Sequence, residues 1–334
     1  MQRTNPTAVK EVEAPCAGIR RLVLPLPYEV QTLNVYLLEG EGGSTVVDTG
    51  VGGPFGRATW GSVFEHLAPA SISALVGTHY HPDHIGAAGW LAAKLDVPFL
   101  CSQVCWLVTK LLLSQDQSDQ EEQLRFFRRL GTSSEDAEVM LAAANGYKLV
   151  VDPPPPAFFR LRDGAEVRLG GRTWRVCCCE GHASELVTLY SEELGVLLCS
   201  DQVLPEISPN VSVWSTSPED DPLGAYLASL ARLRELPDET LCLPAHGEPF
   251  RGLRRRVDEL VEHHRLRLQR IVEALEERRT VAALVDPVFT PGLGTFERMF
   301  AQGELQAHLA LLLGRGEIER EEDERGTWWY ARKR

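Results

Sequence analysis

The stretch Thr78-His79-Tyr80-His81-Pro82-Asp83-His84 places four side chains of metal-ligand type within six residues. It directly follows Ala74-Leu75-Val76, an apolar run that is typical of a buried strand. Alternate residues of an extended chain point to the same side, so His79 and His81 can bind one ion together. The stretch therefore predicts a metal site at the end of a strand.

The second half of the stretch supplies two more ligands. Asp83 and His84 follow as the chain turns toward a helix that we predict from Gly86 to Leu95, and they can serve a second ion. Histidine and carboxylate ligands favour zinc, with iron or manganese as realistic substitutes. The sequence thus predicts two divalent metal ions.

The spacing His-x-His-x-Asp-His after a strand resembles the signature of the metallo-β-lactamase superfamily. Four more motifs stand in the order of that family, and the resemblance covers about residues 19–250. They are Val46-Val47-Asp48-Thr49-Gly50, Glu180-Gly181-His182, Cys199-Ser200-Asp201 and Leu243-Pro244-Ala245-His246-Gly247. The resemblance implies an α/β fold, namely an αββα sandwich.

The resemblance also implies a role for each polar residue of these motifs. The first ion is bound by His79, His81 and His182, the second by Asp83, His84 and His246, and Asp201 bridges the two. Asp48 is expected to orient the ligand loop without binding metal.

Such a binuclear centre predicts hydrolysis. Two divalent ions share a water and lower its pKa toward neutrality, so that a bridging hydroxide can attack. Asp83 can protonate the leaving group, and no nucleophilic Ser or Cys is needed. We therefore predict a zinc-dependent hydrolase of a small-molecule ester, thioester or lactone.

Two segments extend beyond the compact pattern of the family. We predict a catalytic domain over residues 1–255, with a helical insertion at about 103–150 that covers the active site and shapes substrate choice. Residues 256–334 form a second domain, and residues 265–334 resemble the small winged-helix domain of a subgroup that includes lactamase-like endoribonucleases. The motifs also resemble glyoxalase-II-type thioesterases, whose glutathione-binding C-terminal helices are not recognisable here.

That subgroup supplies the alternative function, a metal-dependent endoribonuclease or phosphodiesterase acting on single-stranded RNA. The predicted helix Phe296 to Leu313 offers only Arg298 as a permanent cation, and the acidic run Glu321 to Glu324 follows it. A net charge of −13 also disfavours a phosphate backbone. We expect a small-molecule substrate and no nucleic acid, with packing, lid support or a homodimer as the role of the C-terminal domain.

The sequence predicts a cytoplasmic protein. No apolar run approaches the length of a membrane span, and Met1 to Arg21 lacks the apolar core of a signal peptide. The chain has eight cysteines, none with the spacing of a cysteine zinc site. Three of them, Cys177 to Cys179, are consecutive in a predicted strand and point to alternating faces. We predict that all eight are reduced and structural.

Overall fold

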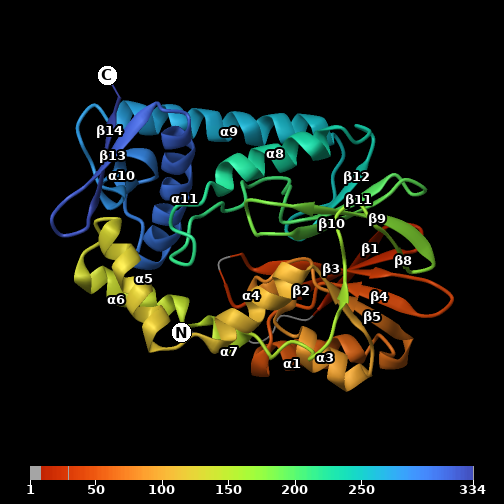
Figure 1. Cartoon of the computed structure of the whole chain (residues 1–334). Coiled ribbons are helices and arrows are strands. Elements are labelled where there is room, and N and C mark those ends of the chain that lie inside the picture. The colour runs from red at the N-terminus through yellow and green to blue at the C-terminus, as the bar shows by residue number, and fades with distance from the viewer. Residues whose placement is uncertain (1–8, 29, 334) are drawn as a thin grey trace.

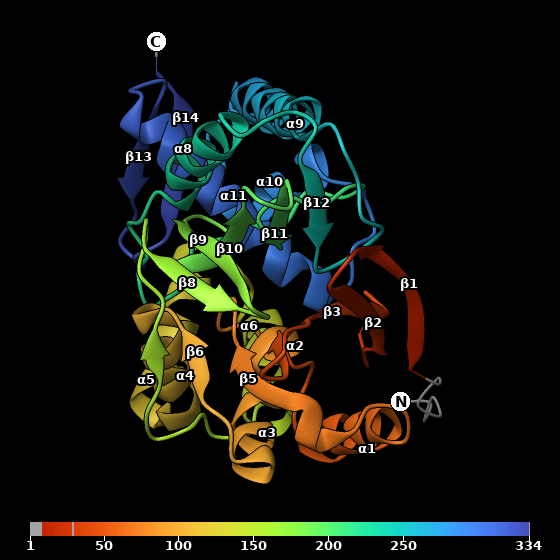
Figure 2. The ribbon, with the colours of Figure 1, turned by 90° about the vertical axis from the view of Figure 1, so that its right-hand side faces the viewer.

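The computed structural model describes residues 9–28 and 30–333. Two β-sheets face each other near its centre (Figures 1 and 2). The first sheet has seven strands in sequence order, with β4 to β7 parallel. These strands are β1 (Lys10–Cys16), β2 (Ile19–Pro25), β3 (Thr32–Leu38), β4 (Ser44–Val47), β5 (Ile72–Val76), β6 (Phe99–Cys101) and β7 (Phe159–Arg160).

The second sheet has five strands in the order β12-β11-β10-β9-β8. They are β8 (Glu166–Leu169), β9 (Arg172–Cys179), β10 (Leu186–Ser191), β11 (Val196–Ser200) and β12 (Leu241–Pro244). β11 and β12 are parallel, as are β4 and β5 in the first sheet. Parallel neighbours end at the same edge of their sheet, so residues that follow these strands are brought close together.

Helices cover the outer face of each sheet, which confirms the predicted αββα sandwich. Figure 1 shows α1 (Gly53–Phe64) and α3 (Ala88–Leu95) below the first sheet, and α8 (Pro222–Arg234) and α9 (Leu253–Ala274) above the second. The buried side chains form three clusters, of which the one between the sheets includes Trp174. Each sheet is therefore buried on both faces.

The predicted insertion is helical and leans on the C-terminal part of the chain. It contains α4 (Gln103–Ser114), α5 (Gln117–Arg129), α6 (Ser134–Ala144) and α7 (Tyr147–Val150). Thr132, between α5 and α6, donates a hydrogen bond to Gln302, and the backbone N–H of Ala282 donates to the carbonyl of Leu130. Figure 1 shows α5 and α6 beside α11. The insertion and the C-terminal helices thus share one apolar cluster.

The C-terminal part contains three helices and a hairpin. After α9 come α10 (Val281–Val288), α11 (Thr295–Gly314), β13 (Ile318–Glu322) and β14 (Trp328–Arg332), and the two strands pair antiparallel. The predicted helix Phe296 to Leu313 is present as α11. The short runs 318–320 and 328–330 on either side of the acidic turn also predict a small hairpin, which β13 and β14 form. The boundary near residue 255 and the name winged helix stay predictions.

Several helix boundaries differ from the sequence-based expectation. The residue pattern predicts a helix near Trp60 to Leu67. The structure has α1 there, which begins earlier, with Pro54 in its first turn where proline is tolerated. The helix expected over residues 86–95 is α3, which begins at Ala88, and a separate short helix, α2 (Pro82–Ile85), precedes it. The short α10 was not predicted, because Pro287 interrupts its pattern from inside the helix.

Two further findings concern expectations from composition. Among the described residues, no helix combines the length and apolarity of a membrane span. All eight cysteines are free, and the structural role expected for them stays a prediction. The signal-peptide expectation concerned Met1 to Arg21, and residues 1–8 of that range lie outside the described residues.

Candidate metal centre

The histidine-rich stretch lies where β5 ends, at the edge of the first sheet that faces the second. The backbone N–H of Val187 in β10 donates to the carbonyl of Thr78, which ties the two sheets together at this point. His81 precedes α2 with an extended backbone, and Pro82 occupies the first position of that helix. The helix begins inside the stretch, so the ligands that follow His81 turn back toward the sheets.

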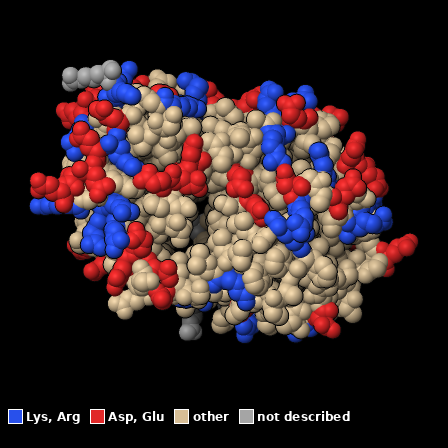
Figure 3. All heavy atoms as spheres, viewed as in Figure 1, with Lys and Arg blue, Asp and Glu red and all other residues tan. Residues whose placement is uncertain are grey.

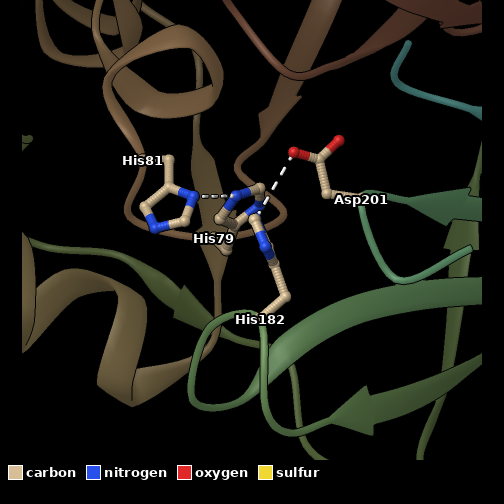
Figure 4. A group of neighbouring side chains, drawn as sticks. All are labelled: His79, His81, His182 and Asp201. Atoms are coloured by element: carbon tan, nitrogen blue, oxygen red, sulfur yellow. Dashed lines mark hydrogen bonds and ion pairs between the residues drawn. The ribbon is translucent and has the colours of Figure 1, made fainter. Parts of the chain in front are cut away.

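A first group of side chains contains three histidines and one aspartate. Its ligand atoms, from His79, His81, His182 and Asp201, lie within 4.8 Å of one another. His79 Nε2 is 2.9 Å from His81 Nδ1, and His182 Nε2 is 3.4 Å from an Asp201 oxygen. Figure 4 shows these atoms converging from the stretch after β5 and from two loops of the second sheet.

A second group lies beside the first. Asp83, His84 and His246 also place their ligand atoms within 4.8 Å of one another. An Asp83 oxygen is 3.3 Å from His246 Nε2 and 3.5 Å from His84 Nε2. The structure therefore brings all seven predicted ligands into two adjacent groups.

Asp201 lies between the two groups. One of its oxygens is 3.3 Å from His84 Nε2 and 3.4 Å from His182 Nε2, and the other is 3.5 Å from His246 Nε2. Two atoms bound at about 2.0–2.1 Å to a tetrahedral ion are separated by about 3.3 Å. The separations around Asp201 thus match those of ligands that share an ion.

Each of three histidines is oriented through its Nδ1 atom. His182 Nδ1 donates to the carbonyl of Asn210 at 2.7 Å, and His246 Nδ1 donates to the carbonyl of Thr32 at 2.7 Å. His84 Nδ1 contacts a carboxylate oxygen of Asp48 at 2.8 Å. Because Nδ1 carries the proton in these contacts, a neutral ring keeps its lone pair on Nε2, which faces the other ligands.

Asp48 lies outside both groups and holds the ligand stretch from behind. It has a left-handed backbone, with φ of 64°, and its carboxylate accepts from the backbone N–H and the hydroxyl of Thr78 at 2.9 and 3.0 Å. The Thr78 hydroxyl also accepts from Ser200, the residue before Asp201. This buried network links the ends of β4, β5 and β11.

Burial and charge shift the pKa values in opposite directions within the site. Burial lowers the pKa of His81 to about 3, with repulsion from His182 as the next cause. Burial alone would also lower the pKa of His84, but the surrounding aspartates, with Asp201 the strongest, raise it well above its usual value. Burial would raise the pKa of Asp201, yet His84 and His246 hold it well below its usual range. The site thus combines neutral rings with a charged pair.

The donor set fits divalent cations. His84 Nε2, His182 Nε2 and Asp201 Oδ1 are buried and have no hydrogen-bond partner. Leaving buried polar atoms unpaired costs about 1–3 kcal/mol each, and all three point into the same space. Nitrogen and carboxylate ligands suit zinc and related divalent ions, which would satisfy these atoms together.

A third group of possible metal ligands lies in the C-terminal part, but its surroundings do not suit a cation. His263 and His264 of α9 lie near Glu304 of α11, but Arg267 already pairs with that carboxylate. Burial lowers the pKa of His263, and Arg267 is the next cause. A divalent cation here would meet a positive surrounding, so we assign no metal to this group.

Sequence reasoning missed three groups that build the site: the Thr78 hydroxyl, the Ser200 hydroxyl and the Asn210 carbonyl. Thr78 and Ser200 stand next to predicted ligands, so adjacency was the available signal. A backbone carbonyl leaves no trace in residue type, and Asn210 could be found only from the fold.

Comparisons with known proteins agree with this geometry. The model of the metallo-beta-lactamase superfamily matches residues 30–246, and that of the metallo-beta-lactamase-like C-terminal domain matches residues 268–333. The chain is 23% identical over 282 residues to the beta-lactamase-like protein 2 homolog of Caenorhabditis elegans, covering 83% of this chain and 78% of the relative.

Two solved structures are similar over nearly their whole length. A beta-lactamase domain protein from Burkholderia ambifaria is 36% identical, with a TM-score of 0.88, and the match covers 99% of this chain and 97% of the other. A metallo-beta-lactamase family protein from Thermus thermophilus is 31% identical, with a TM-score of 0.81 and coverages of 96% and 100%. Together with the family model that spans most of the sequence, they show that this chain belongs to the metallo-beta-lactamase superfamily.

Proposed function

We propose that the protein is a hydrolase that uses two divalent metal ions, with zinc as the favoured metal, to cleave a small ester, thioester or lactone. The observation that carries this proposal is the position of Asp201, within 3.3–3.5 Å of histidine nitrogens from both ligand groups. A carboxylate so placed can serve both ions. The three buried ligand atoms that make no hydrogen bond support the same assignment.

The residues of the site have separate tasks in this proposal. His79, His81 and His182 hold the first ion, and the second group holds the other. When bound, the cations would polarise the bond under attack and lower the pKa of the attacking water. Asp48 fixes the ring of His84 and the backbone of the ligand stretch.

Asp83 is the proposed proton carrier. Its side chain is 17% exposed, about twice as much as that of Asp201. Burial would raise the pKa of Asp83, but His84 and His246 lower it below the usual value, so the carboxylate is ionised at neutral pH. It can therefore accept a proton from the attacking water and pass it to the leaving group.

Charge supports a small substrate over RNA. Figure 3 shows a hollow near the middle of one face, with acidic side chains along its upper margin and basic ones scattered across the surface. Arg298, the permanent cation of the predicted helix Phe296 to Leu313, is paired with Asp286 at 2.8 Å. A phosphate backbone would meet a paired arginine and an acidic margin.

A substrate comparison tests the function. We expect the metal-loaded protein to hydrolyse at least one class among esters, thioesters and lactones, and to show no salt-sensitive affinity for single-stranded RNA. The measurement is turnover on each class, together with RNA gel shifts and cleavage at low and moderate salt. RNA binding that weakens steeply with salt, and cleavage that His81→Ala abolishes, would instead favour the endoribonuclease.

Metal content is the next prediction. The protein reconstituted with zinc should hold close to two ions per chain, and His79→Ala or His182→Ala should lose the first of them. Elemental analysis after gel filtration measures the ratio. His66→Ala serves as the control, because His66 belongs to neither ligand group. A chain that binds no metal after reconstitution would contradict the assignment.

Metal binding should release a proton at pH 7. The pKa of His84 is raised well above its usual value, so the metal-free ring is charged at pH 7 and must lose its proton to bind an ion. Metal affinity should therefore rise as pH increases from acidic values toward that raised pKa. Calorimetric titration in buffers of different ionisation enthalpy counts the protons, and a count of zero would contradict a charged His84.

A further inference from the structure

The segment from Leu204 to Val213, which we call the His182 loop, follows the Asp201 motif and has no helix or strand of its own. The carbonyl of Asn210 in this loop accepts the hydrogen bond from His182 Nδ1 at 2.7 Å. That bond sets the direction of the ring and leaves Nε2 facing Asp201. The position of the His182 loop thus decides where one ligand of the first group points.

The start of the His182 loop is held by α9. Arg256 Nε donates to the carbonyl of Leu204 at 2.6 Å, and Arg256 also donates to the carbonyl of Ile207 at 2.9 Å. The Arg256 side chain is only 14% exposed, and its bond to Leu204 is partly buried, whereas the bond to Ile207 lies at the surface. A guanidinium that binds two carbonyls of one segment restrains that segment directly.

The end of the loop is held by α11. The backbone N–H of Val213 donates to the carbonyl of Gly303 at 3.1 Å. A Cβ at Gly303 would lie 2.8 Å from the Ser212 hydroxyl oxygen and 2.9 Å from Ser212 Cβ. Glycine inside a helix costs about 1 kcal/mol relative to alanine, so its presence here fits the close approach of the loop.

We propose that α9 and α11 set the metal affinity of the first ligand group by fixing the His182 loop. The contacts run from Arg256 and Gly303 to the loop, and from Asn210 to His182. The C-terminal helices are then positioning elements of the metal site. This inference rests on the proposed metal-binding function, because it assigns a role to residues that support one of its ligands.

The test is Gly303→Ala in the full-length chain, with Gly314→Ala as the matched control. Gly314 lies at the end of the same helix, and a Cβ there meets nothing within 4 Å. Zinc affinity is measured by competition with a chromogenic chelator. We expect one of the two ions to bind about 10- to 100-fold more weakly in Gly303→Ala, as for partners that orient a metal ligand. The other ion, and both ions in Gly314→Ala, should keep wild-type affinity.

A rescue variant distinguishes displacement of the loop from general damage. Adding Ser212→Gly to Gly303→Ala removes both atoms closest to the new methyl group, so affinity for the weakened ion should recover. The melting temperature of each metal-free variant reports whether the fold is intact. Ser212→Gly alone is the reference, because it removes the hydrogen bond that the Ser212 hydroxyl donates to the Asn210 side chain. Recovery to the affinity of that reference supports the proposal, and a loss that persists beyond it in a folded double variant counts against it.

Arg256→Met provides an independent route if Gly303→Ala fails to fold. It removes both bonds to the His182 loop. Glu259→Gln is its control, since that change affects the surface ion pairs of Glu259 with Arg255 and Arg256 and leaves both bonds to the loop in place. We expect the same selective weakening. Folded Gly303→Ala or Arg256→Met protein with two wild-type zinc affinities would overturn the inference. A wild-type chain that binds no zinc would instead overturn the proposed function.

Discussion

Asp201→Ala should lower hydrolytic turnover by at least about 100-fold and reduce the metal content of the chain. The carboxylate is the only one of the seven predicted ligands within 3.5 Å of His84, His182 and His246 together. Removing it leaves the cations without the negative charge that lies between the two groups. It also leaves the charged form of His84 without its strongest partner. Turnover and elemental analysis on the same sample measure both effects.

The control is Asp258→Ala. Asp258 is an exposed aspartate that pairs with Arg234 on the surface, and such pairs contribute little to stability. That variant should keep normal turnover and metal content. Asp201→Asn adds a graded comparison, because it keeps the shape of the side chain and removes its charge. An Asp201→Ala protein with two ions and near-normal turnover would contradict the role proposed for this residue.

Removal of residues 265–334 should abolish cooperative folding. α11 packs against α6 of the insertion and against α8, which covers the second sheet. One apolar cluster includes residues of all three helices. Deletion would uncover side chains such as Phe126 and Tyr226. Exposing each fully buried aromatic or aliphatic side chain costs about 1.5–3 kcal/mol. The summed cost for several such side chains therefore exceeds the free energy of unfolding of a typical protein, about 5–15 kcal/mol. Circular dichroism and thermal unfolding measure the result.

A point substitution tests the same packing without deletion. Leu305→Ala should destabilise the chain by about 2–5 kcal/mol, because Leu305 is fully buried in the shared cluster. Leu266→Ala, at a leucine that is 45% exposed, should change stability by less than about 0.5 kcal/mol. A soluble, cooperatively unfolding fragment of residues 1–264 would contradict the shared-core description. It would favour a catalytic domain that folds by itself.

Much of the fold could be read from periodic apolar patterns. The apolar patterns predict strands over residues 166–169, 186–190 and 196–199, which agree with β8, β10 and β11 to within one residue, since these runs stop at Gly and charged residues. β7 (Phe159–Arg160) was not predicted, because two residues are too few to show the alternation of apolar and polar side chains that marks a strand. The helix α1 was placed too late because its first turn contains glycines and a proline, which normally mark a loop.

The residues of the site likewise include some that could be predicted from the sequence and some that could not. His79, His81, Asp83 and His84 were visible because they are adjacent in sequence, and the more distant ligands were found only through the resemblance. Which carbonyl orients His182 could not be predicted, since Asn210 approaches it through the path of a loop without secondary structure. The position that a backbone carbonyl takes in the folded chain cannot be read from the order of the residues.

The division of ligands between the two sheets has a consequence for how the chain folds. One set of ligands follows β5 of the first sheet, and His182, Asp201 and His246 follow β9, β11 and β12 of the second. Neither sheet alone presents both groups, so high-affinity capture of the ions must come after the sheets have docked. Metal added during refolding should leave the early folding rate unchanged and mainly slow unfolding, as expected for contacts that are absent from the transition state.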